Sequence, residues 1–184
     1  DFIIRRGRDK AKVNLFPCAS ITRNIEGKQM TEFGLLKARG IIGFSDVNKT
    51  IQNTELMSRV MNYASDLDVL IMQHAEDQEM SKNSCINEGE VATRLGLKGI
   101  SYIAEKIIIE RDLSLLKEYP CRYHINQISS KKSLSVIKNN KSNGVKFTTG
   151  VSINNLSLNQ NDIGEFRTFL KLSSPLREEQ DRLS

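Results

Sequence analysis

A histidine at the end of an apolar run is the residue of this chain best placed to do chemistry. The run Val69–Gln73 is apolar almost throughout, and His74 follows it directly, with Glu76 and Asp77 close behind. A strand that is buried on both faces of a parallel sheet has this composition. Residues just after such a strand lie at its C-terminal end, where α/β barrels carry metal ligands and general bases. We therefore interpret His74 as a candidate metal ligand or general base. The alternative is a histidine that only makes hydrogen bonds at the end of the strand.

Two other polar residues belong to neighbouring predicted strands. Asp46 ends the run Ile41–Ser45, where an aspartate can either ligate a metal or cap the turn. His124 lies inside a further predicted strand, and a lone histidine there is more typical of a structural group. Since His74 and His124 are the only histidines of the chain, these residues are few for a site that must hold two metal ions.

The elements that must position these residues alternate between strand and helix. The patterns predict strands over Lys12–Ile21, Ile41–Ser45, Val69–Gln73, Arg122–Ile128 and Lys146–Ile153. They predict helices over Glu32–Arg39, from Asn53 or Thr54 onward, over Ile100–Tyr119, and from Ser129 or Ser130 to near Gly144. Such alternation gives a parallel sheet with helices outside it. An open doubly wound sheet and a (β/α)8 barrel both satisfy the pattern, and no glycine-rich nucleotide-binding loop favours the open sheet.

The longest predicted helix has one apolar face. Its residues at helical spacing, which we expect to point into the protein, are Ile103, Ile107, Leu113 and Leu116. A buried face of this length predicts a helix that packs along the sheet.

Composition excludes several classes of protein. The 184 residues are 39% hydrophobic and 27% charged, as in a soluble globular protein, and no apolar run is long enough to cross a membrane. The net charge of +5 comes from scattered lysines, so we expect no nucleic-acid partner. Three widely spaced cysteines, Cys18, Cys85 and Cys121, indicate reduced thiols in the cytoplasm. Because the chain starts at Asp1 and ends just after a charged run, we expect a piece of a longer protein.

Six short motifs rich in polar residues follow one another along the chain. They are Phe44-Ser45-Asp46, Gln73–Asp77, Asn87–Glu90, Arg94–Ile100, Arg122-Tyr123-His124 and Pro175-Leu176-Arg177. In this order they resemble the class I dihydroorotases, cyclic amidohydrolases of pyrimidine synthesis. The resemblance implies a (β/α)8 barrel of the amidohydrolase type, with residues 1–184 forming the middle of a single barrel domain, roughly strands 3 to 7. It also implies zinc as the cofactor, a His-x-His ligand pair upstream, and a catalytic aspartate downstream of the chain.

The same resemblance places several replacements on functional positions. His74 matches a histidine ligand of the family. Val47 stands where the family has a ligating aspartate, with Asp46 at the position before it, and Gln127 stands at a histidine ligand. Valine cannot bind a cation, and glutamine is a poor replacement for imidazole on zinc. The resemblance therefore predicts an atypical metal site.

Two more replacements bear on substrate and on function. Ser173 stands where the family has an asparagine that contacts substrate, and Asn155 replaces a further histidine. One hypothesis is an enzyme that interconverts dihydroorotate and carbamoyl-aspartate with altered metal ligation. The other is a noncatalytic homologue that acts as a structural partner of aspartate carbamoyltransferase. A related allantoinase or hydantoinase is a third alternative, which the Asn-Glu-Gly and Pro-Leu-Arg motifs disfavour.

Overall fold

Five short parallel strands form the main sheet in the computed structural model, which describes residues 2–184. Their order in the sheet is β1 (Cys18–Ala19), β2 (Gly43–Phe44), β3 (Leu70–His74), β6 (Arg122–Asn126) and β7 (Thr148–Thr149). Each neighbouring pair is parallel, and neighbours in the sheet follow the order of the chain. This is the α/β arrangement that the alternating sequence pattern predicts.

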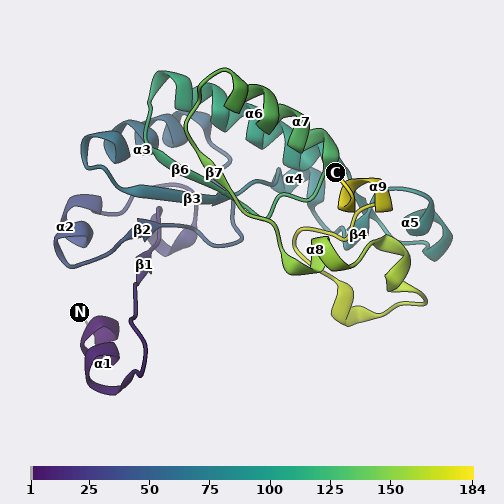
Figure 1. Ribbon diagram of the computed structural model, residues 1–184, viewed down its shortest axis with the longest axis horizontal. Coiled ribbons are helices and arrows are strands. Elements are labelled where there is room, and N and C mark those ends of the chain that lie inside the picture. The colour runs from purple at the N-terminus through teal and green to yellow at the C-terminus, as the bar shows by residue number, and fades with distance from the viewer. Residues whose placement is uncertain (1) are drawn as a thin grey trace.

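Helices connect the strands. They are α1 (Phe2–Lys10), α2 (Phe33–Ala38), α3 (Thr54–Asp66), α4 (Gln78–Ser81), α5 (Glu90–Leu95), α6 (Tyr102–Glu118), α7 (Lys131–Ser142), α8 (Ile153–Ser157) and α9 (Glu179–Arg182). Short 3-10 turns are η1 (Arg23–Ile25), η2 (Gln160–Ile163) and η3 (Thr168–Leu170). Helices α3, α6 and α7 lie together on one side of the sheet (Figure 1). No helix within residues 2–184 has both the length and the apolar character that a membrane crossing needs.

Side chains of the helix-facing side of the sheet form the core. Phe44, Ile71 and Tyr123 occupy one row of the strand register and are all at most 2% exposed. Phe33 of α2 stacks on Phe44 with ring centroids 4.1 Å apart, and Tyr63 of α3 stacks on Phe33 at 5.7 Å. Because successive residues of a strand point to opposite faces, this row fixes which residues face away from the helices.

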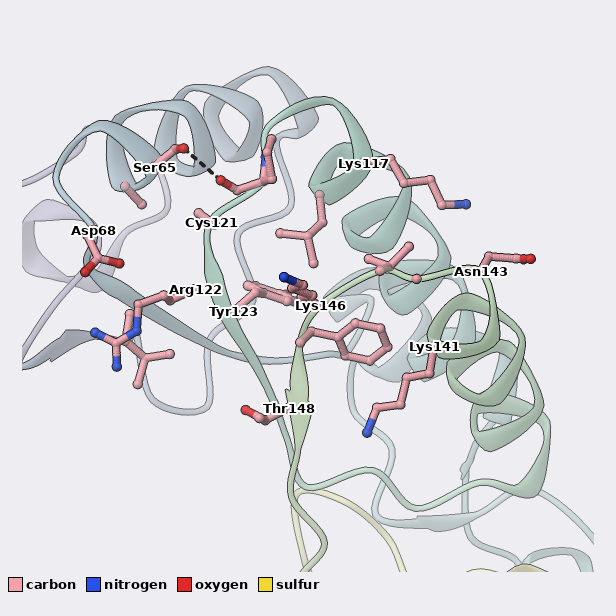
Figure 2. Close-up of a pocket in the computed structure, with 17 residues that line it drawn as sticks. Ser65, Asp68, Lys117, Cys121, Arg122, Tyr123, Lys141, Asn143, Lys146 and Thr148 are labelled. Atoms are coloured by element: carbon pink, nitrogen blue, oxygen red, sulfur yellow. Dashed lines mark hydrogen bonds between the residues drawn. The ribbon is translucent and has the colours of Figure 1, made fainter.

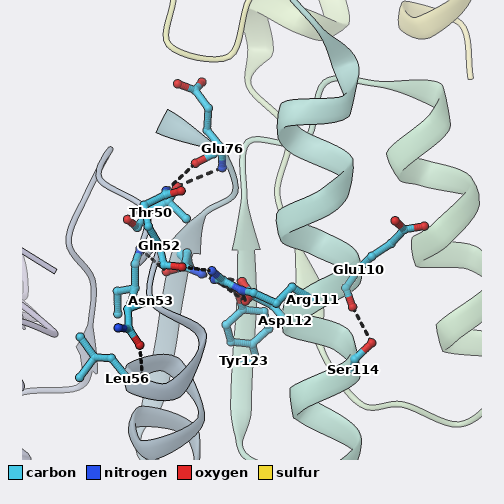
Figure 3. Close-up of polar contacts among 12 residues, drawn as sticks. Thr50, Gln52, Asn53, Leu56, Glu76, Glu110, Arg111, Asp112, Ser114 and Tyr123 are labelled. Carbon is cyan, nitrogen blue, oxygen red and sulfur yellow. Dashed lines mark hydrogen bonds and ion pairs between the residues drawn. The ribbon is translucent and has the colours of Figure 1, made fainter. Parts of the chain in front are cut away.

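A buried polar network crosses the same layer. The Asp112 carboxylate of α6 accepts hydrogen bonds from Arg111, from the Gln73 amide and from the Tyr123 hydroxyl at 2.6 Å (Figure 3). The Gln73 amide oxygen accepts the Ile51 backbone N–H at 3.0 Å. Burial raises the pKa of Asp112, while the charge of Arg111 and these hydrogen bonds oppose the shift. The network joins α6 to β3, to β6 and to the loop after β2.

A second, two-stranded sheet lies beside the main one and was not predicted. It pairs β4 (Ile86–Asn87) with β5 (Gly99–Ile100) in parallel. The sheet packs in a small apolar cluster of its own, with α5 and the segment after α8; the buried members are Ile86, Val91, Ala92, Ile163 and Leu176. Gly99 is essential to this pairing, because a Cβ there would lie 2.4 Å from the Cα of Glu88.

Replacing Gly99 with alanine is expected to lower the free energy of unfolding by about 1–3 kcal/mol, because the backbone of Glu88 cannot move aside for a methyl group. Gly34 is the matched control, since it lies within α2 and its Cβ would meet the Tyr63 hydroxyl at 3.4 Å. Alanine there should stabilise the helix by up to about 1 kcal/mol. Urea unfolding of both variants measures the difference, and equal losses would contradict this account of β4–β5.

The strand predicted over Lys12–Ile21 is wrong for most of its length. Only Cys18–Ala19 pairs with a neighbour, and helix α1 precedes it without having been predicted. Val13 and Phe16 are 72% and 67% exposed. The spacing of Val13 and Phe16 was therefore misleading, whereas Ile21 at the end of the segment is buried.

Two other predicted elements also need correction. Ile103 and Ile107 of α6 are 42% and 47% exposed, although Leu113 and Leu116 are buried as expected. The buried side of α6 includes Glu105 and Asp112, so its direction is set by polar groups that an apolar pattern does not count. The strand predicted over Lys146–Ile153 is confined to β7, and Ile153 instead begins α8 behind the Ser152 cap.

Candidate functional site

Both histidines lie on the sheet face that points away from the helices. Ile71, Gln73 and Tyr123 contact the helix layer, so the alternate residues of β3 and β6 point the other way. The register places His74 beside Asn126, at the C-terminal ends of the two strands. In parallel α/β folds this end of the strands is where ligands bind. We name His74, Glu76, Asn126 and Gln127 the rim site.

His74 is the unpartnered group of the rim site. Its side chain is buried, with 4% of the residue exposed, and neither ring nitrogen has a hydrogen-bond partner. Its Nε2 lies 3.6 Å from Oε2 of Glu76. Buried polar atoms are nearly always paired, so an imidazole with two unpaired nitrogens is poised for a ligand or a proton.

The backbone around His74 is held firmly. The Thr50 hydroxyl donates to the His74 carbonyl at 2.5 Å and accepts the Glu76 N–H at 3.0 Å (Figure 3). Gln52 donates its amide to the Glu76 carbonyl at 3.0 Å. Asp77 caps α4 by accepting two backbone N–H groups, which occupies its Oδ1. The loop after β2 therefore fixes the turn that follows β3 and leaves the His74 ring free.

Asp46 has its carboxylate fully engaged by the protein. Oδ1 accepts the backbone N–H groups of Ile21 at 2.8 Å and Thr22 at 3.0 Å, and Oδ2 accepts the Thr22 hydroxyl. The residue is 2% exposed. These contacts give Asp46 a structural role, which joins the end of β2 to the segment after β1. Metal ligation by Asp46 stays a prediction with no contact here to support it.

Val47 and Gln127 follow β2 and β6 and share an unusual backbone. Val47 has φ 59° and Gln127 has φ 51°, in the left-handed region. Counting on from the Phe44–Ile71 pair, Val47 follows β2 at the level where His74 ends β3. A β-branched residue is disfavoured in this conformation, whereas aspartate and asparagine tolerate it. Position 47 therefore has a backbone that suits aspartate or asparagine better than the valine present there.

His124 has a partner of its own. Its Nδ1 lies 2.7 Å from the Thr148 hydroxyl, and burial lowers the pKa of the ring. A Cβ at Gly150 would lie 3.1 Å from Nε2, so the absence of a side chain there leaves room for the imidazole. These contacts agree with a structural histidine.

A buried arginine joins the segments that carry the sequence motifs. Arg177 is 4% exposed, and it donates to the Asn87 side chain at 2.7 Å, to the Ile100 carbonyl at 2.8 Å and to the Ser129 hydroxyl at 3.1 Å. Its Nη2 is 4.0 Å from the Glu105 carboxylate. Burial lowers the pKa of Arg177, against the opposing effect of Glu105. We name these five residues the arginine hub.

Carboxylates occupy the N-terminal end of α7. Glu105 accepts the backbone N–H groups of Ser129 and Ser130, each at 3.1 Å. Asp181 of α9 accepts the Lys131 N–H at 2.7 Å. A helix N-terminus attracts anions, but this one already has two protein carboxylates. Carboxylates of the protein itself therefore occupy the N-terminal end of α7.

The remaining residues singled out in the sequence lie around the hub. Ser173 is exposed, and the next residue, Ser174, donates its hydroxyl to the Gln127 carbonyl at 2.8 Å. Asn155 is buried and donates to the Pro175 carbonyl at 3.0 Å, while its Oδ1 is unpaired. The segment around Pro175 thus packs against the turn that carries Gln127.

The side chains of the described residues do not match the zinc that the sequence resemblance implies. Within residues 2–184, no three His, Cys, Asp or Glu side chains form a group that could hold a metal ion. A closed zinc site needs four ligands, and a catalytic one needs three from the protein. The rim site offers the His74 ring and the Glu76 carboxylate. The described residues therefore do not make up a complete zinc site.

Comparison with known proteins identifies the family. The family model described as dihydro-orotase-like matches residues 1–133. The dihydroorotase of Ehrlichia chaffeensis is 41% identical over 184 residues, which is 100% of this chain and 41% of that protein. The chain belongs to the dihydroorotase-like family. The dihydroorotase of Syntrophus aciditrophicus is 38% identical over 181 residues, 98% of this chain and 42% of that protein. The chain thus spans about two fifths of the length of these relatives.

Solved structures with the same fold are hydantoinases. L-hydantoinase (dihydropyrimidinase) from Arthrobacter aurescens superposes with a TM-score of 0.72 at 16% identity, covering 98% of this chain and 42% of that one. D-hydantoinase from Bacillus sp. AR9 gives a TM-score of 0.70 at 15% identity, over 95% and 40% of the two chains. The predicted amidohydrolase-type barrel, represented here by a part of it, is therefore confirmed as the fold of this dihydroorotase-like chain.

Sequence reasoning missed the partners that surround the site. The position of Asn126 beside His74 depends on the strand register, which the sequence does not show. No sequence pattern indicated a role for Thr50, because its hydroxyl reaches a carbonyl 24 residues away. The Asn-Glu-Gly and Pro-Leu-Arg motifs did indicate Asn87 and Arg177, though not their contact.

Proposed function

We propose that this chain is the central part of a dihydroorotase, a cyclic amidohydrolase that interconverts dihydroorotate and carbamoyl-aspartate in pyrimidine synthesis. The observation that carries the proposal is identity of 41% with a dihydroorotase along the whole of the chain. In the proposed protein, residues 1–184 belong to one barrel domain. Cys18, Cys85 and Cys121 are all free thiols, which supports a reducing, cytoplasmic compartment.

We propose that the substrate binds at the rim site. His74 is the buried group there with unpaired polar atoms, and Glu76 is its acidic neighbour. This pair can hold a proton or a ligand beside a cyclic amide, while Thr50 keeps their backbone in place. We propose zinc as the family cofactor with an atypical ligand set, in which His74 is the contribution of β3.

Replacing His74 with asparagine should lower kcat/KM for dihydroorotate by about 100-fold or more in the full-length protein, because a general base or ligand is lost. His124 is the matched control, since it already has Thr148 as a partner. His124→Asn should lower kcat/KM by less than about tenfold. Steady-state kinetics of both variants measure this, and equal losses would remove His74 from the proposed site.

A second function is favoured by one specific observation, the missing third ligand. The absence of a complete group of metal-binding side chains within residues 2–184 fits a noncatalytic homologue that supports aspartate carbamoyltransferase. Size-exclusion chromatography of the full-length protein, alone and mixed with aspartate carbamoyltransferase, tests this function. A stable complex together with no dihydroorotate turnover would favour it. Turnover by the isolated protein would exclude the noncatalytic role.

A further inference from the structure

A large groove opens at the N-terminal ends of the strands. Figure 2 shows it between the end of α3, the start of β6 and the loop that joins α7 to β7. Its volume is about 1300 Å³. The buried side chains of Ala64, Leu116 and Tyr123 form part of its floor. We name it the basal groove; the rim site lies at the other ends of the same strands.

The basal groove is basic. Its lining includes Lys117, Arg122, Lys141 and Lys146, and Asp68 is the one acidic side chain among the described residues that line it. None of the four basic side chains forms an ion pair within residues 2–184, although Lys141 lies 5.5 Å from the ring centroid of Phe147. Uncompensated charges of one sign in a concave surface attract a partner of the opposite sign.

Helix ends account for only half of this charge. Lys117 and Lys141 lie in the last turns of α6 and α7, where cations stabilise the helix dipole. Arg122 begins β6 and Lys146 lies in the loop before β7, so neither has that role. Their presence beside the other two therefore needs another explanation.

The volume of the basal groove and its apolar floor favour a polypeptide over a small anion as its ligand. Small-molecule pockets usually have volumes of about 300–1,000 Å³, less than this groove. The partly buried side chains of Val145 and Phe147 add apolar surface beside the lysines. An apolar centre with a charged rim is typical of protein–protein contacts.

We propose that the basal groove docks an acidic segment of a partner protein, one that carries carboxylates among apolar side chains. The carboxylates pair with Arg122, Lys141 and Lys146, and the apolar side chains cover Val145 and Phe147. Because the groove and the rim site lie at opposite ends of the strands, docking leaves the rim site open. The inference does not depend on the proposed catalytic activity.

Fluorescence anisotropy with a labelled peptide of alternating glutamate and leucine tests the proposal on the full-length protein. Lys141→Gln combined with Lys146→Gln should weaken binding about tenfold, since two ion pairs are lost. The matched control is Lys132→Gln with Lys138→Gln, two exposed lysines of α7, the helix that also carries Lys141, and neither lines the groove. This control should change binding by less than about twofold.

Further probes separate the possible ligands. A peptide in which serine replaces every leucine should bind more weakly, because it cannot use the apolar floor. Inorganic phosphate and a single-stranded oligonucleotide should not displace the original peptide at equal concentration. Displacement by either would overturn the proposal in favour of a general anion site. Absence of peptide binding, or equal loss in the groove and control variants, would also overturn it.

Discussion

Replacing Val47 with aspartate and Gln127 with histidine is expected to raise the affinity of the protein for Zn²⁺ by at least about 100-fold. A structural zinc site with four ligands is worth about 10–16 kcal/mol, so each added ligand contributes roughly 3 kcal/mol. Both positions follow strands that flank β3 and have positive φ, and at position 47 aspartate tolerates this left-handed backbone better than valine does. The register of β2 and β6 against β3 is the reason that we expect the new side chains to reach the His74 ring.

Competition with a zinc-sensitive dye measures this affinity for the full-length protein. The control adds the same residue types elsewhere, as Val13→Asp with Gln180→His, at two exposed positions away from the rim site. This control should leave the affinity unchanged. No gain from the Val47 and Gln127 replacements would mean that the ends of β2 and β6 do not face the His74 ring.

Replacing Arg177 with methionine is expected to lower the free energy of unfolding by about 3–5 kcal/mol. The change removes the donors to Asn87 and Ile100 and leaves the buried Glu105 carboxylate without its nearby cation. Methionine keeps much of the side-chain volume, so lost hydrogen bonds and charge dominate the effect. Urea unfolding measures the loss.

Arg182 provides the control for this measurement. It pairs with Glu179 at the surface, with 28% and 43% of the two side chains exposed. Surface ion pairs contribute little, so Arg182→Met should lower the free energy of unfolding far less than Arg177→Met does. If the two replacements cost the same, the arginine hub does not hold the fold together in the way its contacts indicate.

Local sequence signals predicted the elements of the centre of the chain. The apolar run before His74 predicted β3 because a strand buried on both faces needs such a run. Helix starts were predicted at Asn53 or Thr54 and at Ser129 or Ser130. In the structure, the side chains of Asn53 and Ser130 accept the expected backbone N–H groups. These features depend on neighbours in the sequence, which is why they could be found without the structure.

Contacts between distant segments explain what the sequence did not show. Strands β4 and β5 have two residues each and no apolar run, so their pairing depends on the tertiary contacts of the cluster around them. Arg177 reaches Asn87 across 90 residues, which no spacing within a motif encodes. The direction of α6 likewise depends on the partners of Glu105 and Asp112.

The candidate site also combines a feature that the local sequence predicted with features that depend on distant contacts. The position of His74 at a strand end followed from pattern, but its unpaired ring depends on what the surrounding loops leave uncovered. The sequence did not decide whether Asp46 ligates a metal or caps a turn. In the structure its carboxylate accepts the backbone N–H groups of Ile21 and Thr22 in the preceding segment. Sequence alone cannot show that a carboxylate accepts several hydrogen bonds when the donors lie in another segment of the chain.

Dihydroorotate turnover and zinc content, measured on one preparation of the full-length protein, test the central claim most directly. We propose that the barrel framework persists while the ligands after β2 and β6 have been replaced. This proposal therefore predicts turnover with at most about one zinc per chain after dialysis, because the rim site supplies fewer ligands than two ions need. Two firmly held zinc ions per chain, or no turnover at any zinc concentration, would contradict it.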